Sequence, residues 1–222
     1  MGWLVRRWPA LSLLLLTIPL LTGSGIVVSA AEATGAPAVK RIVFLGDSLT
    51  AGYGLEEDQA YPALIQARMP SWTVANAGVS GDTSAGALRR VPWVLKAKPD
   101  VVFIAIGAND GLRGQPVDQL EANLRRIIAQ VRAAGATAVL AGMRMPVNYG
   151  EDYRTAFAAV YPRVAEETRT PLMPFILESV AMKPELNQTD GIHPNAAGQK
   201  LVAAAVLAFL ASLDQPAAAP AK

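Results

Sequence analysis

The amino-acid sequence predicts an α/β protein, a three-layer α/β/α sandwich around a sheet of parallel strands. Three observations predict this fold. Short apolar runs rich in β-branched residues alternate with longer segments of helical periodicity. These runs are apolar throughout, which is typical of strands that are buried on both faces of a parallel sheet. Glycine-rich polar segments follow the runs directly, at the place where such folds bind ligands.

The strands are predicted from the apolar runs. Leu172–Phe175 is the shortest of them, and Pro174 makes it a weak or edge strand because proline cannot donate a hydrogen bond to a neighbouring strand. The four stronger runs are Arg41–Leu45, Trp72–Asn76, Val101–Ile106 and Thr137–Met143. With Leu172–Phe175, they predict a sheet of about five strands.

The helices are predicted in the segments between and after these runs. In residues 117–134, apolar residues recur at helical spacing with charged residues off the stripe, as is typical of an amphipathic helix that covers a sheet. The predicted helices are Tyr61–Arg68, Thr83–Ala97, Val117–Ala134, Glu151–Thr168 and Ala196–Leu213. Strands that alternate with helices favour right-handed βαβ units, and no repeat or linker divides them, so residues 32–214 are predicted to form one domain.

Both ends of the chain are predicted to lie outside this domain. Residues 1–31 have the features of a cleaved secretory signal peptide, with Arg6 and Arg7 before an apolar core and small residues at Val28–Ala31. An uncleaved anchor is the alternative, since the uncharged run 9–31 is long enough to span a bilayer. We expect an exported protein, periplasmic or secreted. The sequence does not decide between the general secretory (Sec) route and the twin-arginine route. Residues 215–222 are predicted to be a disordered tail.

Composition excludes several classes of protein. Without Arg6 and Arg7 the chain carries 18 basic and 18 acidic residues and no long basic run, which argues against nucleic-acid binding. The absence of cysteine excludes disulfides, thiolate metal sites and a cysteine nucleophile, and the single histidine, His193, excludes a multi-histidine metal centre. We therefore expect no cofactor and no metal. A serine or carboxylate mechanism remains.

Ser48, Asp190 and His193 are the candidate catalytic residues. Ser48 lies on a strand-to-helix turn, and a serine hydroxyl is a weak nucleophile until a base removes its proton. His193 is the available base, and Asp190, three residues before it, is close enough in sequence for one turn to bring its carboxylate to the imidazole. Each residue alone is better explained as part of a turn or as a structural polar group. Their joint placement after strands favours catalysis.

The backbone amides of Ser48 and Gly81 and the side-chain amide of Asn109 are the candidate oxyanion donors. A glycine at position 81 allows close approach of a substrate oxygen, and Asp82 or Thr83 is expected to cap the helix that follows. Asn109 offers an uncharged N–H, which suits a transient negative charge. The alternative is that Asn109-Asp110-Gly111 is only a tight turn.

These segments resemble the signature blocks of the SGNH, or GDSL, hydrolases. The blocks are Gly46-Asp47-Ser48-Leu49, Gly78–Ser84, Gly107-Ala108-Asn109-Asp110 and Asp190-Gly191-Ile192-His193-Pro194, in the family's order. Gly46–Tyr53, Asn109–Gly114 and Met145–Gly150 are similar to the bacterial periplasmic branch of thioesterases, arylesterases and lysophospholipases. The resemblance implies a flavodoxin-like sandwich with Ser48 as nucleophile, Gly81 and Asn109 as oxyanion donors, and Asp190 and His193 completing a triad. Ala108 stands where many members have glycine.

The loop after the fourth predicted strand is expected to contact the substrate. Its apolar side chains would accept an acyl chain, and Arg113 would contact an anionic leaving group. The alternative for the loop side chains is that they pack between the layers of the fold. The alternative for Arg113 is a solvated side chain that caps a turn. The loop residues are Met143, Met145, Val147 and Tyr149.

The sequence therefore predicts a serine esterase for carboxylic esters and thioesters, including aryl esters, acyl-CoA and lysophospholipids. Its expected partner is a small acyl ester or thioester. We expect a monomer without nucleic acid and without stable membrane association once the signal is removed. Two alternatives stay open, an acetyl esterase for acetylated carbohydrate and a non-catalytic flavodoxin-like binding module.

Overall fold

The computed structural model describes residues 1–2 and 40–213. Of the predicted signal peptide only Met1 and Gly2 are described, and the predicted tail 215–222 lies outside the described residues.

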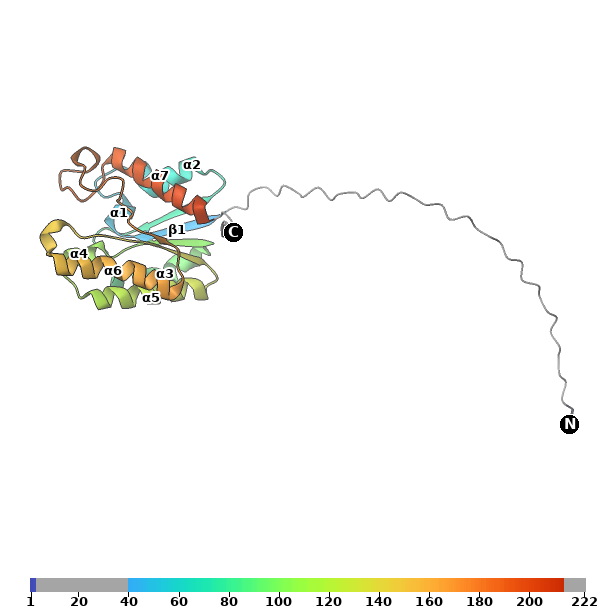
Figure 1. Ribbon diagram of the computed structural model, residues 1–222. Coiled ribbons are helices and arrows are strands. Elements are labelled where there is room, and N and C mark those ends of the chain that lie inside the picture. The colour runs from blue at the N-terminus through green and yellow to red at the C-terminus, as the bar shows by residue number, and fades with distance from the viewer. Residues whose placement is uncertain (3–39, 214–222) are drawn as a thin grey trace, which may run out of the picture. The chain divides into compact units, whose positions relative to one another are not determined.

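A single sheet of five parallel strands forms the middle layer, which confirms the predicted fold class (Figure 1). The strand order is β2-β1-β3-β4-β5, the order of flavodoxin-like folds. The strands are β1 (Arg41–Gly46), β2 (Thr73–Gly78), β3 (Val101–Ala105), β4 (Thr137–Ala141) and β5 (Leu172–Met173).

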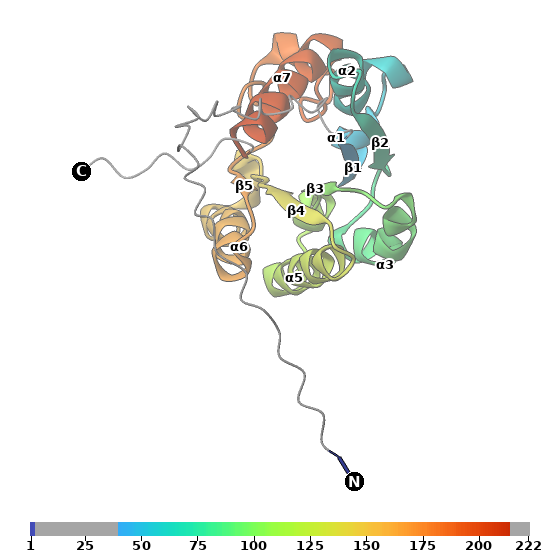
Figure 2. The same cartoon turned by 90° about the vertical axis from the view of Figure 1, so that its right-hand side faces the viewer.

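Helices cover both faces of the sheet. Helices α2 and α7 lie on one face, and α3, α5 and α6 lie on the other (Figures 1 and 2). The helices are α1 (Ser48–Ala51), α2 (Tyr61–Arg68), α3 (Ser84–Val94), α4 (Ala108–Leu112), α5 (Val117–Ala133), α6 (Glu151–Thr168) and α7 (Ala196–Leu213). Short 3₁₀ turns occupy Glu57–Gln59, Leu95–Ala97, Val147–Tyr149 and Pro184–Leu186.

Element boundaries differ from the predicted ones mainly where the chain leaves the sheet. The run Thr137–Met143 was expected to be one strand, but β4 ends at Ala141. At Gly142 the chain crosses the segment after β5 so closely that a Cβ would lie 2.1 Å from the carbonyl oxygen of Pro174. β5 is shorter than predicted and stops at Met173, directly before that proline. The predicted helix 83–97 is α3 followed by a 3₁₀ turn.

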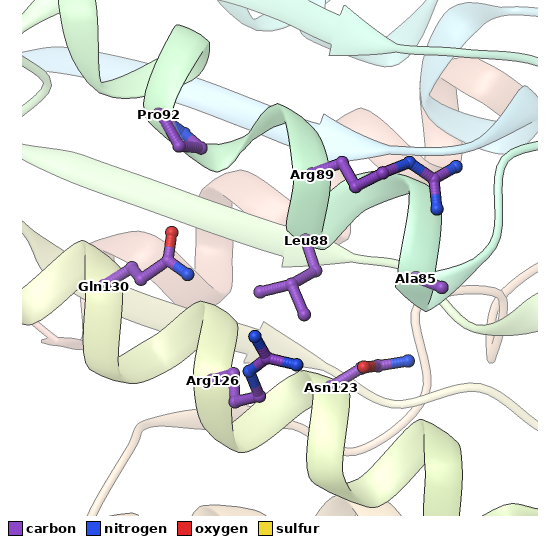
Figure 3. Close-up of a pocket in the computed structure, with 7 residues that line it drawn as sticks. All are labelled: Ala85, Leu88, Arg89, Pro92, Asn123, Arg126 and Gln130. Carbon is purple, nitrogen blue, oxygen red and sulfur yellow. The ribbon is translucent and has the colours of Figure 1, made fainter.

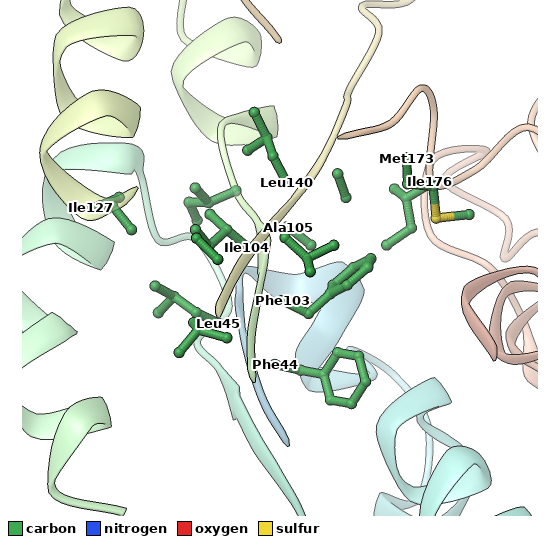
Figure 4. Packing of buried hydrophobic residues seen from close by; sticks show 14 of the residues in the cluster. Phe44, Leu45, Phe103, Ile104, Ala105, Ile127, Leu140, Met173 and Ile176 are labelled. Carbon is green, nitrogen blue, oxygen red and sulfur yellow. The ribbon is translucent and has the colours of Figure 1, made fainter. Parts of the chain in front are cut away.

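The core lies on both sides of the sheet because each strand directs alternate side chains to opposite faces. Phe44 and Phe103 pair in register and point to one face, while Leu45 and Ile104 point to the other (Figure 4). Tyr61 of α2 packs edge-on against Phe44, with the ring centroids 5.2 Å apart. All five side chains are buried.

Helix α7 is apolar enough to cross a membrane by length and composition alone. Its buried stripe includes Val202, Val206 and Leu210, so it packs as a core helix of this domain. Gln199, near its start, accepts a hydrogen bond from the backbone N–H of Tyr61 and donates one to the carbonyl of Leu49. These bonds tie α7 to the segments that carry α1 and α2.

Truncation of Phe103 should test the central core. We expect Phe103→Ala to lower the free energy of unfolding by about 3–5 kcal/mol, because it removes a fully buried ring and leaves a cavity beside Phe44. Urea unfolding followed by circular dichroism measures this. Trp93→Ala is the control, since that ring is 63% exposed and its loss should change stability by no more than about 0.5 kcal/mol. Equal effects of the two changes would contradict the core assignment.

Candidate active site

Four separate segments meet at the carboxyl edge of the sheet. Ser48 follows β1, Gly81 lies between β2 and α3, and Asn109 is in α4, directly after β3. Asp190 and His193 lie in the loop before α7. Because parallel strands end at the same edge, residues far apart in the sequence become neighbours there.

Ser48, His193 and Asp190 form a continuous hydrogen-bonded chain. The Nε2 atom of His193 lies 2.8 Å from the Oγ atom of Ser48, and Nδ1 lies 2.7 Å from Oδ2 of Asp190. The aromatic ring of Tyr53 stacks beside the imidazole, with centroids 4.8 Å apart. This arrangement allows proton transfer from the hydroxyl to the imidazole, with the carboxylate on the opposite nitrogen.

The Asp190 carboxylate is held by its own loop. Its Oδ1 accepts hydrogen bonds from the backbone N–H groups of Ile192 and His193, each at 3.0 Å. Partial burial acts to raise the pKa of Asp190, but hydrogen bonds from the backbone and ring of His193 and from Ile192 outweigh it and lower that pKa below its usual value. The group is therefore ionised at neutral pH and able to stabilise an imidazolium.

Helix α1 fixes the position of Ser48. Asp47 caps it, because Oδ1 accepts a hydrogen bond from the backbone N–H of Leu49 at 3.0 Å. Gly52, with a φ of 79°, ends it after one turn. The first N–H groups of a helix have no partner within it, so the amide of Ser48, the first residue of α1, is left without an intrahelical acceptor.

Hydrogen bonds hold Gly81 and Asn109 in the two loops that follow β2 and β3. Gly81 has a φ of 78°, and its carbonyl accepts a hydrogen bond from Arg113 at 2.8 Å. Nδ2 of Asn109 donates to the carbonyl of Asp82 at 3.0 Å, which leaves its second N–H for another acceptor. Thr83 caps α3, so the predicted choice between Asp82 and Thr83 is settled in favour of Thr83.

The predicted substrate loop is only partly exposed. Met143 and Met145 are 2% and 6% exposed and belong to the core, where the sulfur of Met145 packs over Gly111. Val147 is 68% exposed, and the hydroxyl of Tyr149 donates to the carbonyl of Leu112 at 3.0 Å. In this structure the methionines thus fill the space between layers, which is the packing alternative considered for them.

Sequence reasoning missed a group of buried carboxyls beneath the site. Burial raises the pKa of Asp47 to about 7, with smaller contributions from Asp82 and Asp110, although the Leu49 N–H opposes the change. The Oδ2 atom of Asp47 has no hydrogen-bond partner among the described residues. Asp110 accepts hydrogen bonds from the hydroxyl and backbone N–H of Ser84, at 2.5 and 2.8 Å. Their adjacency to Ser48 and Asn109 was the only signal in the sequence.

Two cavities open on the surface of the part of the chain that the structure describes. One of about 490 Å³ adjoins the Asp190 loop and is lined by Met182, Lys183, Pro184, Asn187, Gln188, Thr189 and Gly191. Another, of about 360 Å³, runs between α3 and α5 and contains none of the predicted site residues (Figure 3). Within residues 40–213, no three His, Asp or Glu side chains are arranged to hold a metal ion.

The buried Asp47 carboxyl should make stability depend on pH. Between about pH 4 and 7 the folded protein retains a proton on Asp47 that the unfolded chain releases, so stability falls as the pH rises through this window. Asp47→Asn has no carboxyl to titrate at this position. The free energy of unfolding of the variant minus that of wild type should therefore increase from pH 4 to pH 7, by no more than about 4 kcal/mol. Urea unfolding at pH 4, 5.5 and 7.5 measures this. Asp58→Asn, at an exposed carboxyl, is the control; an Asp47→Asn difference that does not vary with pH would refute the assignment.

Comparisons with known proteins identify the family of this chain. Residues 44–201 match the model of the GDSL-like Lipase/Acylhydrolase family. The chain is 46% identical over 170 residues to Thioesterase 1/protease 1/lysophospholipase L1 of Escherichia coli K12, covering 76% of this chain and 82% of that protein. It is 44% identical over 167 residues to Esterase TesA of Pseudomonas aeruginosa, covering 73% and 83%.

Solved structures of relatives have the same fold. The crystal structure of TesA superposes with a TM-score of 0.75 at 42% identity, covering 78% of this chain and 99% of that one. The psychrotrophic esterase EstA from Pseudoalteromonas sp., in a structure inhibited by monoethylphosphonate, gives 0.76 at 35% identity and covers 78% and 98%. The chain therefore belongs to the GDSL-like lipase/acylhydrolase family and is an acyl hydrolase.

Proposed function

We propose that this protein hydrolyses carboxylic esters and thioesters through an acyl intermediate on Ser48. The observation that carries the proposal is the hydrogen-bonded chain from Ser48 through His193 to Asp190, with both links at 2.7–2.8 Å. A serine within hydrogen-bond distance of an imidazole whose other nitrogen faces a carboxylate is the arrangement of an activated nucleophile.

The reaction has two halves that use the same groups. His193 takes the proton of Ser48 as Oγ attacks the acyl carbon, and the imidazolium then protonates the leaving alcohol or thiol as its bond to the acyl carbon breaks. In the second half, His193 takes a proton from water, the hydroxide attacks the acyl-serine, and the proton returns to Ser48 as the carboxylic acid leaves. Asp190 holds the imidazole in the required tautomer throughout.

The tetrahedral oxyanion would be stabilised by three N–H donors. These are the backbone amides of Ser48 and Gly81 and the free side-chain N–H of Asn109. Each comes from a different segment at the edge of the sheet. Donors that are fixed before the reaction stabilise developing charge without having to reorganise.

The surroundings of the proposed nucleophile favour an acyl or aryl group over a carbohydrate. Tyr53, Val79 and Ile192 are exposed apolar side chains that adjoin the site: Tyr53 stacks on His193, Ile192 precedes it, and Val79 lies two residues before Gly81. Apolar surface of this kind contacts chains and rings. The names of the relatives, which include thioesterase, arylesterase and lysophospholipase, support the same substrate class.

Acyl-CoA and lysophospholipids are the proposed anionic substrates. Arg113, an exposed residue beside Gly81, remains the proposed contact for their phosphates. Val147 and Tyr149 remain candidate contacts for the acyl chain. Export through a cleaved signal peptide at residues 1–31, and a monomeric state, also stay predictions.

Replacement of the proposed nucleophile and base should abolish turnover. We expect Ser48→Ala and His193→Ala each to lower kcat/KM for p-nitrophenyl esters by at least about 10³-fold, with folding unchanged. Esters from two to sixteen acyl carbons are measured for both variants and wild type. Activity that rises towards longer chains supports the proposed substrate class, whereas activity confined to acetate favours the carbohydrate acetyl esterase.

An activated phosphonate ester supplies an independent measurement for the same prediction. Mass spectrometry should find one phosphonyl group on Ser48 of the wild type and none on Ser48→Ala. Wild-type activity in Ser48→Ala would overturn the proposed mechanism, and inactivity of the wild type on every ester would favour the non-catalytic binding module.

The side-chain donor can be tested separately from the nucleophile. Asn109→Ala should lower kcat by about 10²–10³-fold and leave KM nearly unchanged, because the donor acts on the transition state more than on the bound ester. Gln130→Ala is the matched control, since Gln130 lines the cavity between α3 and α5 that contains none of the predicted site residues (Figure 3). This variant should retain wild-type kinetics. A change in KM with an unaltered kcat would assign Asn109 to substrate binding instead.

A further inference from the structure

Arg90 of α3 links three segments beneath the proposed oxyanion donors. Its Nε donates to Oδ2 of Asp82 at 2.8 Å, its Nη1 to the carbonyl of Ala77 at 2.9 Å, and its Nη2 to the carbonyl of Gly46 at 3.1 Å. The side chain is 22% exposed and that of Asp82 is 12% exposed. The guanidinium is therefore largely enclosed, and all three of its nitrogens are used.

Two of these contacts, to Gly46 and to Asp82, lead to the three donors. Gly46 is the last residue of β1 and lies two residues before Ser48. Asp82 follows Gly81 directly, so fixing its carboxylate also fixes the peptide that precedes it. The carbonyl of the same Asp82 accepts the hydrogen bond from Asn109, which couples the third donor to Arg90 through one residue.

We propose that Arg90 is a positioning residue that fixes the spacing of the three oxyanion donors without touching the substrate. The inference rests on the function proposed above. A planar guanidinium presents its N–H groups in a rigid fork, so one side chain can hold two strand ends and a carboxylate at fixed separations. A lysine ammonium at this position would supply the charge but not the fork.

The surrounding chain is built to accept this contact. A Cβ at Gly86 would lie 1.6 Å from Oδ1 of Asp82, so the carboxylate occupies the space that a side chain would fill. A second link joins the same segments, since Asp110, next to Asn109, accepts two hydrogen bonds from Ser84 at the start of α3. With Arg90 removed, this link would still hold α4 to α3 but would leave the end of β1 unattached to Asp82.

The prediction concerns kcat more than KM or stability. Arg90→Met should lower kcat by about 10–100-fold with KM changed less than about threefold, because a donor displaced by a fraction of an ångström stabilises the transition state poorly. Arg90→Lys and Asp82→Asn should lower kcat in the same way but by less. These two variants test the prediction if Arg90→Met does not fold. The pH dependence of kcat/KM should keep its wild-type shape, because Arg90 bonds to neither His193 nor Asp190.

Amide hydrogen exchange supplies a readout that does not depend on activity. Exchange in the segments 78–84 and 107–112 should be faster in Arg90→Met and Arg90→Lys than in wild type, whereas the strands β3 and β4 should be unaffected. Arg89→Met is the matched control, since Arg89 is the neighbouring arginine on α3 and lines the cavity between α3 and α5 (Figure 3). It should match wild type in kinetics and in exchange.

The outcomes separate this inference from the proposed function. Wild-type kcat and exchange in Arg90→Met would overturn the positioning role, as would a rise in KM at constant kcat. A fall in kcat that parallels a general loss of stability, with uniform acceleration of exchange, would assign Arg90 a merely structural role. Should Ser48→Ala remain active in the same assay, the proposed function falls, and exchange alone decides whether Arg90 holds these segments together.

Discussion

The candidate site depends on one constraint: the parallel strands β1, β2 and β3 end in register at the same edge of the sheet. β1 lies between β2 and β3, and Gly46 pairs with Gly78 on one side and with Ala105 on the other. The loops that follow therefore leave the sheet side by side and bring Ser48, Gly81 and Asn109 together. A slip of one residue in this register would turn the side chains of a strand to the opposite face, so the buried core on both faces also fixes the site.

The same edge explains why glycine ends both β1 and β2. A Cβ at Gly78 would lie 2.3 Å from the backbone nitrogen of Ala51, and one at Gly46 would lie 2.0 Å from Oγ1 of Thr50. The short helix that carries Ser48 thus rests directly on the strand ends, with no side chain between them. This close packing gives the proposed nucleophile a rigid support in a chain that has no disulfide to provide one.

Buried polar groups lie directly under the candidate site. Asp47, Asp82 and Asp110 lie close enough for the latter two to raise the pKa of the first, and Arg90 is the cation that bonds to this group. An unsatisfied buried carboxyl oxygen is unfavourable on its own. Its persistence directly beside Ser48 is in keeping with the concentration of such groups at functional sites.

Local patterns in the sequence determined the secondary structure and the identity of the reacting groups. The bounds of α2, α6 and α7 were predicted correctly, and Asp190 and His193 were paired because they lie three residues apart in one loop. Helices α1 and α4 are too short to show a period, and the burial of Met143 and Met145 depends on the helices that cover them. The contacts of Arg90 span up to 44 positions, and only the register of the sheet brings such distant segments within hydrogen-bonding distance.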